Sequence, residues 1–239
     1  MRKNVFVVIA CAGAAASSAF GQIAYTSFEE PAVFGGQYVD TGDPLVAHAL
    51  INNVGEPLVN YTSIGGELGF SAFYTPSAQS SSTTGLSEGD FVGVTDFTGT
   101  VGAYTHGLNG YEISDADGLM TVSLDTVNYT GTWNVSIDYY LQDTGYEADD
   151  RVRIWATVDG GVELDILAAS GDDIKNHVGA WTTGTLDLSS YTMATLHFEL
   201  DSNAASEALF VDNIVFAVPT PGTLALTSLG LVALGRRRR

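Results

Sequence analysis

The sequence predicts an all-β fold in which two antiparallel sheets pack face to face. Apolar and polar residues alternate with a period of two in many short segments of residues 22–218. Turns rich in glycine or aspartate, such as Asp159-Gly160-Gly161, separate these segments, and no segment between the two ends carries the apolar stripe of a helix. Short alternating strands with frequent turns are typical of β-sandwiches.

The two clearest strands are residues 133–141 and 152–158. Trp133, Val135 and Ile137 alternate with polar side chains in the first, and Val152 and Ile154 do so in the second. Since successive side chains of a strand point to opposite faces, each strand has one apolar face. Further strands are expected, in chain order, near residues 24–28, 91–95, 111–113, 119–124, 162–168, 184–188, 195–200 and 209–218.

The chain divides into three segments: a signal peptide at residues 1–21, one β-sandwich domain at 22–218, and a C-terminal sorting signal at 219–239. The middle segment is long enough for one substantial core. Its polar stretch at 77–85 has no proline and is expected to be a long exposed loop rather than a linker between domains.

The N-terminus has the pattern of a secretory signal peptide. Arg2 and Lys3 precede an apolar stretch at residues 5–16, and the small residues Ala19 and Gly21 stand three and one positions before Gln22. Signal peptidase is therefore an expected partner. Cleavage before Gln22 removes the only cysteine, Cys11, so the mature domain has no disulfide. The alternative is a lipoprotein processing box in which Cys11 is acylated.

The domain between the signals is strongly acidic. Six of the nine basic residues lie in the signals while all 28 acidic residues lie between them, which leaves three cations and a net charge of −25. Such a domain repels phosphates, and nucleic acid is excluded as a partner. The charge is either solvated surface or is partly neutralised by Ca²⁺, whose ligands are carboxylate and carbonyl oxygens.

The C-terminus combines a proline-containing polar motif, an apolar run at 224–235 and an arginine cluster. The run would span roughly 18 Å as a helix, well short of the ~30 Å hydrocarbon core, so the membrane holds it only transiently. This order resembles the sorting signal of bacterial PEP-CTERM proteins, although Thr220 stands where the usual motif has Glu. The resemblance implies an exosortase-type enzyme as a partner and a cell-surface or matrix destination. The residues concerned are Pro219, Thr220, Pro221, Gly222, Arg236, Arg237, Arg238 and Arg239. The alternative is a plain, short membrane anchor.

Two short motifs at the ends of the domain make the fold prediction more specific. Phe28-Glu29-Glu30 closes the first expected strand, and residues 208–216 (ALFVDNIVF) form the last. Together they resemble secreted jelly-roll modules, including carbohydrate-binding modules and MAM-like domains. The resemblance implies neighbouring first and last strands and a structural Ca²⁺ held by Glu29 or Glu30 and Asp212, with Asp40 and Asp43 as weaker candidates. The alternative is that Asp212 caps a turn and the glutamates are solvated.

The remaining acidic clusters predict turns and loops. Residues 115–118 (DADG) resemble the start of an EF-hand loop but lack its later glutamate. Residues 147–150 and 172–173 lie in expected loops, where acids are common.

The sequence supplies no catalytic motif. The mature domain has no cysteine and no Gly-x-Ser-x-Gly elbow, and its four histidines are scattered singly. A glycosidase needs two carboxylates at a fixed separation, and the sequence has no motif that singles out a catalytic pair among its 28 acidic residues. We therefore expect a non-enzymatic protein, with a glycan-active hydrolase as the weakest alternative.

One group of residues suggests carbohydrate binding. If the apolar residues of strands 133–141 and 152–158 face the core, then Asp138, Tyr140, Arg153 and Trp155 point outward from neighbouring strands of one sheet. Exposed aromatic rings beside hydrogen-bonding groups favour sugars, including acidic extracellular polysaccharide. The alternative is an aromatic and ion-pair patch that stiffens the sheet. The expectation is thus a secreted, non-catalytic, calcium-stabilised jelly-roll protein, or alternatively a carbohydrate-binding adhesin.

Overall fold

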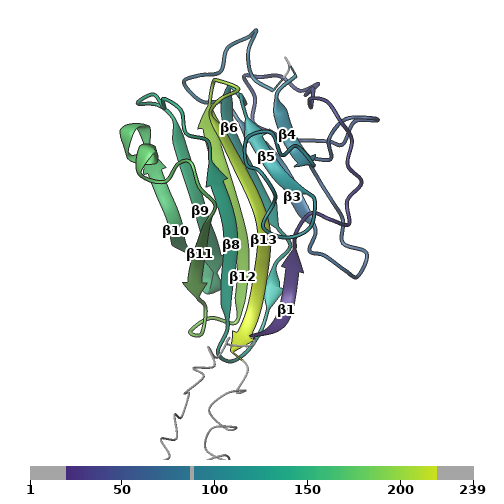
Figure 1. Cartoon of the computed structure of the whole chain (residues 1–239), viewed down its shortest axis with the longest axis vertical. Coiled ribbons are helices and arrows are strands. Elements are labelled where there is room, and N and C mark those ends of the chain that lie inside the picture. Colours follow the sequence, from purple (N-terminus) through teal and green to yellow (C-terminus); the bar gives the residue numbers. More distant parts are fainter. Residues whose placement is uncertain (1–19, 87–88, 220–239) are drawn as a thin grey trace, which may run out of the picture. The chain divides into compact units, whose positions relative to one another are not determined.

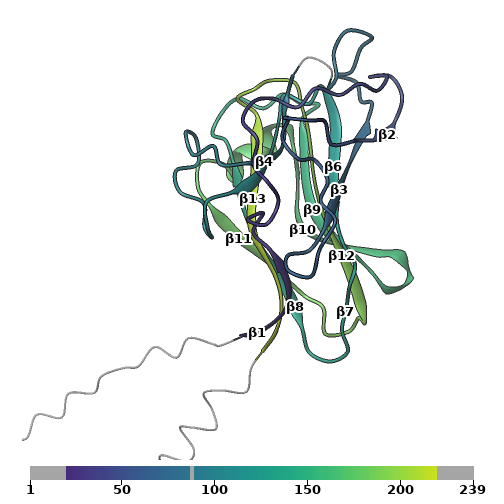
Figure 2. The same cartoon turned by 90° about the vertical axis from the view of Figure 1, so that its right-hand side faces the viewer.

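The computed structural model describes residues 20–86 and 89–219. Residues 22–218 form one compact unit in which two antiparallel sheets pack against each other (Figure 1; Figure 2). The predicted all-β sandwich is therefore confirmed. The expected sorting residues from Thr220 onward lie outside the described part of the chain. Within the described part, no helix is both long enough and apolar enough to cross a membrane.

The first sheet has six strands in the order β11-β8-β13-β5-β4, with β1 beside β13. Its strands are β1 (Phe20–Thr26), β4 (Phe91–Thr95), β5 (Gly110–Ser114), β8 (Asn134–Leu141), β11 (Thr182–Asp187) and β13 (Ala208–Pro219). The purple β1 and the yellow-green β13 run side by side in Figure 1, so the first and last long strands are neighbours, as the jelly-roll resemblance implies.

The second sheet has seven strands in the order β10-β9-β12-β6-β3-β2, with β7 beside β12. Its strands are β2 (His48–Ala49), β3 (Phe70–Thr75), β6 (Gly118–Leu124), β7 (Val127–Asn128), β9 (Arg151–Val158), β10 (Val162–Ser170) and β12 (Met193–Ser202). Two 3-10 helices, η1 (Asp159–Gly161) and η2 (Gly171–Asn176), flank β10.

The core lies between the sheets and follows the alternation in the sequence. In β8, Val135 and Ile137 are fully buried while Ser136 between them is only partly buried. An aromatic group fills one end, where the ring of Tyr111 lies 5.4 Å from that of Phe70 and 5.5 Å from that of Phe198. Edge-to-face contacts of this kind add to the free energy of apolar burial.

The described strands differ from the sequence prediction in several places: β2, β3 and β7 were not expected, and β1 has other bounds than expected. β3 was not expected, because Ala72, Phe73 and Tyr74 are apolar in succession and hide the alternation; the structure buries Ala72 and Tyr74 and leaves Phe73 44% exposed. β1 begins at Phe20, two residues before the cleavage point predicted at Gln22. β1 pairs with β13.

Candidate functional site

The four residues predicted to bind carbohydrate do not share a face. Arg153 and Trp155 lie on β9 in the seven-stranded sheet, whereas Asp138 and Tyr140 lie on β8 in the six-stranded sheet. The prediction of one common sheet is therefore wrong. Its physical cause is the connection at residues 142–150, which carries the chain from one sheet to the other instead of forming a hairpin.

Asp138 and Tyr140 serve the packing of the six-stranded sheet. Asp138 accepts hydrogen bonds from the hydroxyl of Thr183 and from the amide of Asn213 at 2.9 Å. The ring of Tyr140 lies 5.8 Å from that of Trp181 and 6.3 Å from that of Phe210. These contacts belong to a small apolar cluster with Val101 and Tyr104, which covers part of the outer face of this sheet.

Trp155 is buried instead of exposed, since only 7% of its surface is accessible. Its indole stacks on the imidazole of His197 at 4.8 Å, and the guanidinium of Arg153 lies 4.5 Å from the indole centroid. Arg153 is held by Glu163 at 2.8 Å and by Asp165 at 2.7 Å. For Arg153 and Trp155 the structure therefore has an aromatic and ion-pair patch with His197, Glu163 and Asp165.

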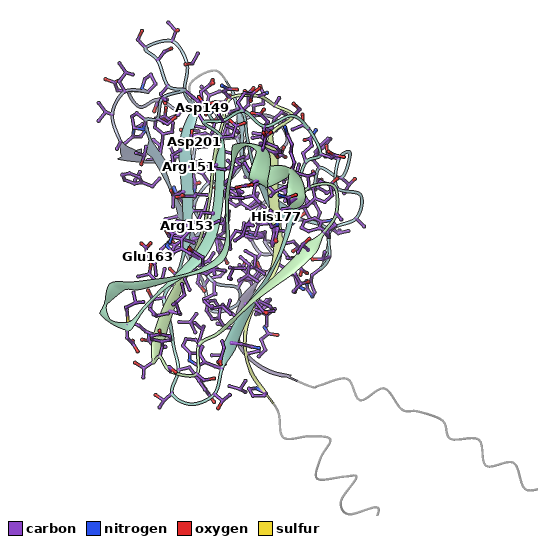
Figure 3. All side chains as sticks on the ribbon, turned by 90° about the vertical axis from the view of Figure 1, so that its left-hand side faces the viewer. Asp149, Arg151, Arg153, Glu163, His177 and Asp201 are labelled. Atoms are coloured by element: carbon purple, nitrogen blue, oxygen red, sulfur yellow. The ribbon has the colours of Figure 1, made fainter. Side chains whose placement is uncertain are left out.

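We call one group of outward side chains of the seven-stranded sheet the polar face: Ser71, Phe73, Thr121, Ser123, Arg151, Arg153, His197, Glu199 and Asp201. Leu119 and Thr75 lie on the same side of the sheet, in the row of Arg151 and Asp201. Figure 3 shows Asp201, Arg151, Arg153 and Glu163 following one another along this side of the molecule. His177, which follows η2 directly, lies apart from them.

The strand register places the polar face in ordered rows. One row crosses four strands, from Arg153 through Glu199 and Thr121 to Phe73. The hydroxyl of Thr121 donates to Glu199 at 3.2 Å, and burial raises the pKa of Glu199. In the next row, Ser123 and the Nδ1 atom of His197 are 2.8 Å apart. Donors and acceptors therefore alternate across the sheet, with an exposed ring at the end of the first row.

An open groove of about 410 Å³ lies beside these rows, lined in part by Arg151, Arg153 and Glu199 together with Ser170 and Asp173. The side chain of Arg151 is 48% exposed and meets Asp201 at 3.7 Å. Two of the three cations of residues 22–218 therefore line one groove. The groove can offer guanidinium donors and carboxylate acceptors to the same ligand.

The residues predicted to hold Ca²⁺ each have other hydrogen-bond partners. Glu29 accepts from the backbone N–H groups of Leu108 and Asn109 at 2.7 and 2.6 Å. Glu30 accepts from the hydroxyl of Tyr61 and the N–H of Glu67, both at 2.9 Å. The two glutamates thus hold the segments 61–67 and 108–109 against the residues that follow β1. They make these hydrogen bonds without any contribution from Asp212.

The three aspartates of the predicted calcium set are likewise engaged. Asp212 accepts from the hydroxyl of Thr105 at 3.0 Å and the N–H of His106 at 2.7 Å, and burial raises its pKa to about 6. Asp40 meets His48 at 2.6 Å, and Asp43 accepts from the N–H of Leu45 at 2.9 Å. Among the described residues, no three of these five acids bring their carboxylate oxygens within 4.8 Å of one another, and calcium binding by them stays a prediction.

Among the described residues, two other sets of carboxylates come close enough to share an ion: Asp90 with Asp115 and Asp117, and Glu147 with Asp150 and Glu207. The sequence interpretation treated Asp115 and Asp117 as a turn and Glu147 and Asp150 as a loop. The third member of each set comes from a distant segment, so no local spacing could have indicated the grouping.

Sequence reasoning also missed Glu67, which is 1% exposed. It accepts from the N–H and the hydroxyl of Ser27 at 3.1 and 2.8 Å, and from the N–H of Glu29 at 3.1 Å. A single acid that follows two glycines gives no indication in the sequence that it accepts hydrogen bonds from a distant segment. The only related feature in the sequence is the pair Thr26-Ser27 at the end of β1, whose polar groups need partners.

No protein-family model matches the sequence, and no curated protein matches it either. Solved structures give distant matches. A xylan-binding domain from Paenibacillus barcinonensis has 14% identity and a TM-score of 0.29, with 87% of this chain and 100% of that chain covered. A family 16 carbohydrate-binding module has 12% identity and a TM-score of 0.35, over 54% of this chain and 86% of that one.

An adhesin domain of Lys-gingipain from Porphyromonas gingivalis has 11% identity and a TM-score of 0.35, over 49% of this chain and 79% of that one. TM-scores of this size describe a partial likeness between strand arrangements. They do not indicate what this chain binds, which has to be argued from its own side chains.

Proposed function

We propose that this chain is a secreted, non-catalytic carbohydrate-binding protein of the cell surface or the extracellular matrix. The observation that supports this most is the polar face with its adjoining groove. A sugar presents hydroxyl groups that both donate and accept, and a sheet surface with alternating donors and acceptors complements them. The binding residues are then Arg151, Arg153 and Glu199 of the groove, with Thr121 and Phe73 along the row.

Arg153 suits this role because its position is fixed before any ligand arrives. Two carboxylates and the indole of Trp155 hold its guanidinium, so binding costs little side-chain entropy. Trp155 is then a positioning residue beneath the surface rather than the stacking platform. Phe73, at 44% exposure, is the ring that can meet the apolar face of a pyranose.

The test is retention of the purified protein on neutral and acidic polysaccharides, measured by affinity electrophoresis. We expect Phe73→Ala and Arg151→Ala each to weaken binding by about tenfold, the usual effect of truncating an interface anchor. Ile64→Ala and Lys175→Ala are the matched controls, because they remove an exposed apolar side chain and an exposed cation elsewhere. Equal retention of all four variants would overturn the proposal, as would a wild type that binds no glycan.

We further propose delivery by an exosortase-type system, which rests on the order of the proline motif, apolar run and arginine cluster at residues 219–239. Deleting Arg236, Arg237, Arg238 and Arg239 should release protein that still carries its apolar tail into the medium, because those charges hold the tail on the cytoplasmic side. Mass spectrometry of surface and medium fractions measures this. Unchanged processing and surface retention would contradict it.

Calcium stabilisation remains a separate proposal, supported by the surplus of 28 acidic residues over three cations in the domain. Ion binding to the native state alone raises the free energy of unfolding, by about 2.7 kcal/mol at a concentration 100 times the Kd. Thermal unfolding with excess Ca²⁺ and with a chelator tests it. Identical melting curves would rule out a calcium site in the folded domain.

A further inference from the structure

A second candidate site lies on the outer side of the six-stranded sheet, at its β4 edge. Three phenylalanines are unusually exposed there: Phe34 at 39%, Phe91 at 36% and Phe97 at 48%. All three line one hollow of about 500 Å³, together with Asp96. Exposed apolar rings gathered around a hollow mark a binding surface more often than a solvent-facing one.

Glu112 of β5 lies at the inner side of this region. It lines an adjoining hollow of about 180 Å³ together with Phe91 and Phe97. Only 5% of the residue is exposed, and its Oε1 accepts from the hydroxyl of Ser114 at 3.3 Å. Its Oε2 has no hydrogen-bond partner within the described ranges. A buried carboxyl oxygen without a partner is costly in a native protein and calls for a specific explanation.

The surroundings of Glu112 are apolar or acidic. No lysine or arginine lines either of the two hollows. Burial and then the charge of Glu112 raise the pKa of the nearby Tyr104 phenol, on which Asp212 and Asp96 also act, and Asp96 lines the larger hollow. Burial raises the pKa of Glu112 itself to about 7. A positive charge placed here would relieve the unfavourable burial of a carboxylate.

We propose that these two adjoining hollows bind a small organic cation of the alkylammonium class, with the rings of Phe91 and Phe97 common to both, Phe34 on one side and the carboxylate of Glu112 on the other. Ring faces attract an ammonium group through their quadrupole and also contact its methyl or methylene groups. The carboxylate adds an opposite charge in a region of low dielectric constant. This site is independent of the proposed polysaccharide surface, because it lies on the other sheet.

Isothermal titration of the full chain with choline tests the proposal, and 3,3-dimethylbutan-1-ol serves as the comparison because it has the same shape without the charge. We expect choline to bind at least about tenfold more tightly than the neutral alcohol at pH 8. We expect Glu112→Gln to remove most of this difference. Glu163→Gln, which alters an exposed acid on the other sheet, is the matched control and should leave choline binding unchanged.

The pH dependence supplies a second readout. The carboxyl group has to lose its proton to attract the cation, so choline affinity should fall as the pH drops below about 7 until it reaches that of Glu112→Gln, which should show no such dependence. Phe97→Ala should weaken choline binding while the protein still unfolds cooperatively. Equal affinities for choline and the alcohol, no measurable choline binding, or an unaffected Glu112→Gln variant would each overturn the proposal. Tight binding of an uncharged methyl glycoside in place of choline would also overturn it.

Discussion

Three buried carboxyl groups make the stability of the domain depend on pH. Burial raises the pKa of Asp212 to about 6, of Glu112 to about 7 and, with the help of nearby acids, of Glu207 to about 8. A carboxyl whose pKa is higher in the folded state than in the unfolded state stabilises the fold when protonated. That stability is complete below the unfolded pKa and is lost as the pH rises through the folded pKa.

We therefore expect the free energy of unfolding to fall between about pH 5 and pH 8. Each unit of pKa shift corresponds to about 1.4 kcal/mol, so Glu112 alone accounts for roughly 3 kcal/mol of the change. Glu112→Gln should be more stable than the wild type at pH 8 and should show a smaller pH dependence. Urea unfolding at the two pH values measures both effects. A wild type that is more stable at pH 8 would contradict this account.

For the single residue Trp155, the sequence could indicate on which face of the sheet the side chain lies, but not which side chains cover it. The alternation of 152–158 correctly places its indole on the outer face of a sheet. Its burial comes from His197, more than forty positions away, and from Arg153 drawn over the ring by two carboxylates of β10. Contacts between strands that are distant in sequence leave no trace in the local pattern, so the ring appears exposed when the sequence is considered alone.

Among the structural elements, the loop at residues 96–109 is held in place by a few single side chains. It lies over the outer face of the six-stranded sheet, where Tyr104 packs with its ring 5.9 Å from that of Trp181. Asp212 holds it at Thr105 and His106, and Glu29 holds it at Leu108 and Asn109. The two acids that the jelly-roll resemblance implied as ion ligands thus bind backbone and side-chain donors of one loop.

Asp212→Ala should loosen this loop. The change removes the carboxylate that accepts from the N–H of His106 and the hydroxyl of Thr105, and a hydrogen bond to a charged group contributes about 1.5–3 kcal/mol. We expect faster amide hydrogen exchange at residues 105–109 in this variant. In the central strands β12 and β9, exchange should change only as far as the global free energy of unfolding changes. Asp43→Ala, which alters an exposed turn, is the control. Unchanged exchange at 105–109 would show that packing alone holds the loop.

Elements were easier to predict than their arrangement. β4 was expected with its observed bounds, and the strands near 111–113, 119–124 and 195–200 lie within β5, β6 and β12. Their alternation is a local property and can be read from neighbouring residues. Membership of a sheet depends on whether a connection turns back or crosses over, which the sequence of residues 142–150 does not specify. The four residues predicted to bind carbohydrate were therefore wrongly assigned to one sheet, although the two strands that carry them, β8 and β9, were predicted.

At the scale of the whole molecule, the strong acidity and the polar face set the partners we expect. A net charge of −25 on residues 22–218 repels polyanions, while two of the three cations in that range lie on the polar face. Neutral polysaccharides should therefore bind better than acidic ones, and binding to them should change little with salt, because it uses hydrogen bonds and ring contacts. Tight, salt-sensitive binding of a polyuronide would contradict this.

Chemical-shift mapping of the isotopically labelled protein with a bound oligosaccharide tests the central proposal most directly. The account predicts that the perturbed residues lie on β3, β6, β9 and β12 around Phe73, Arg151 and Glu199, and that the shifts diminish in Phe73→Ala. Perturbations confined to the six-stranded sheet, or none with any glycan that the protein retains, would contradict the assignment of carbohydrate binding to the polar face.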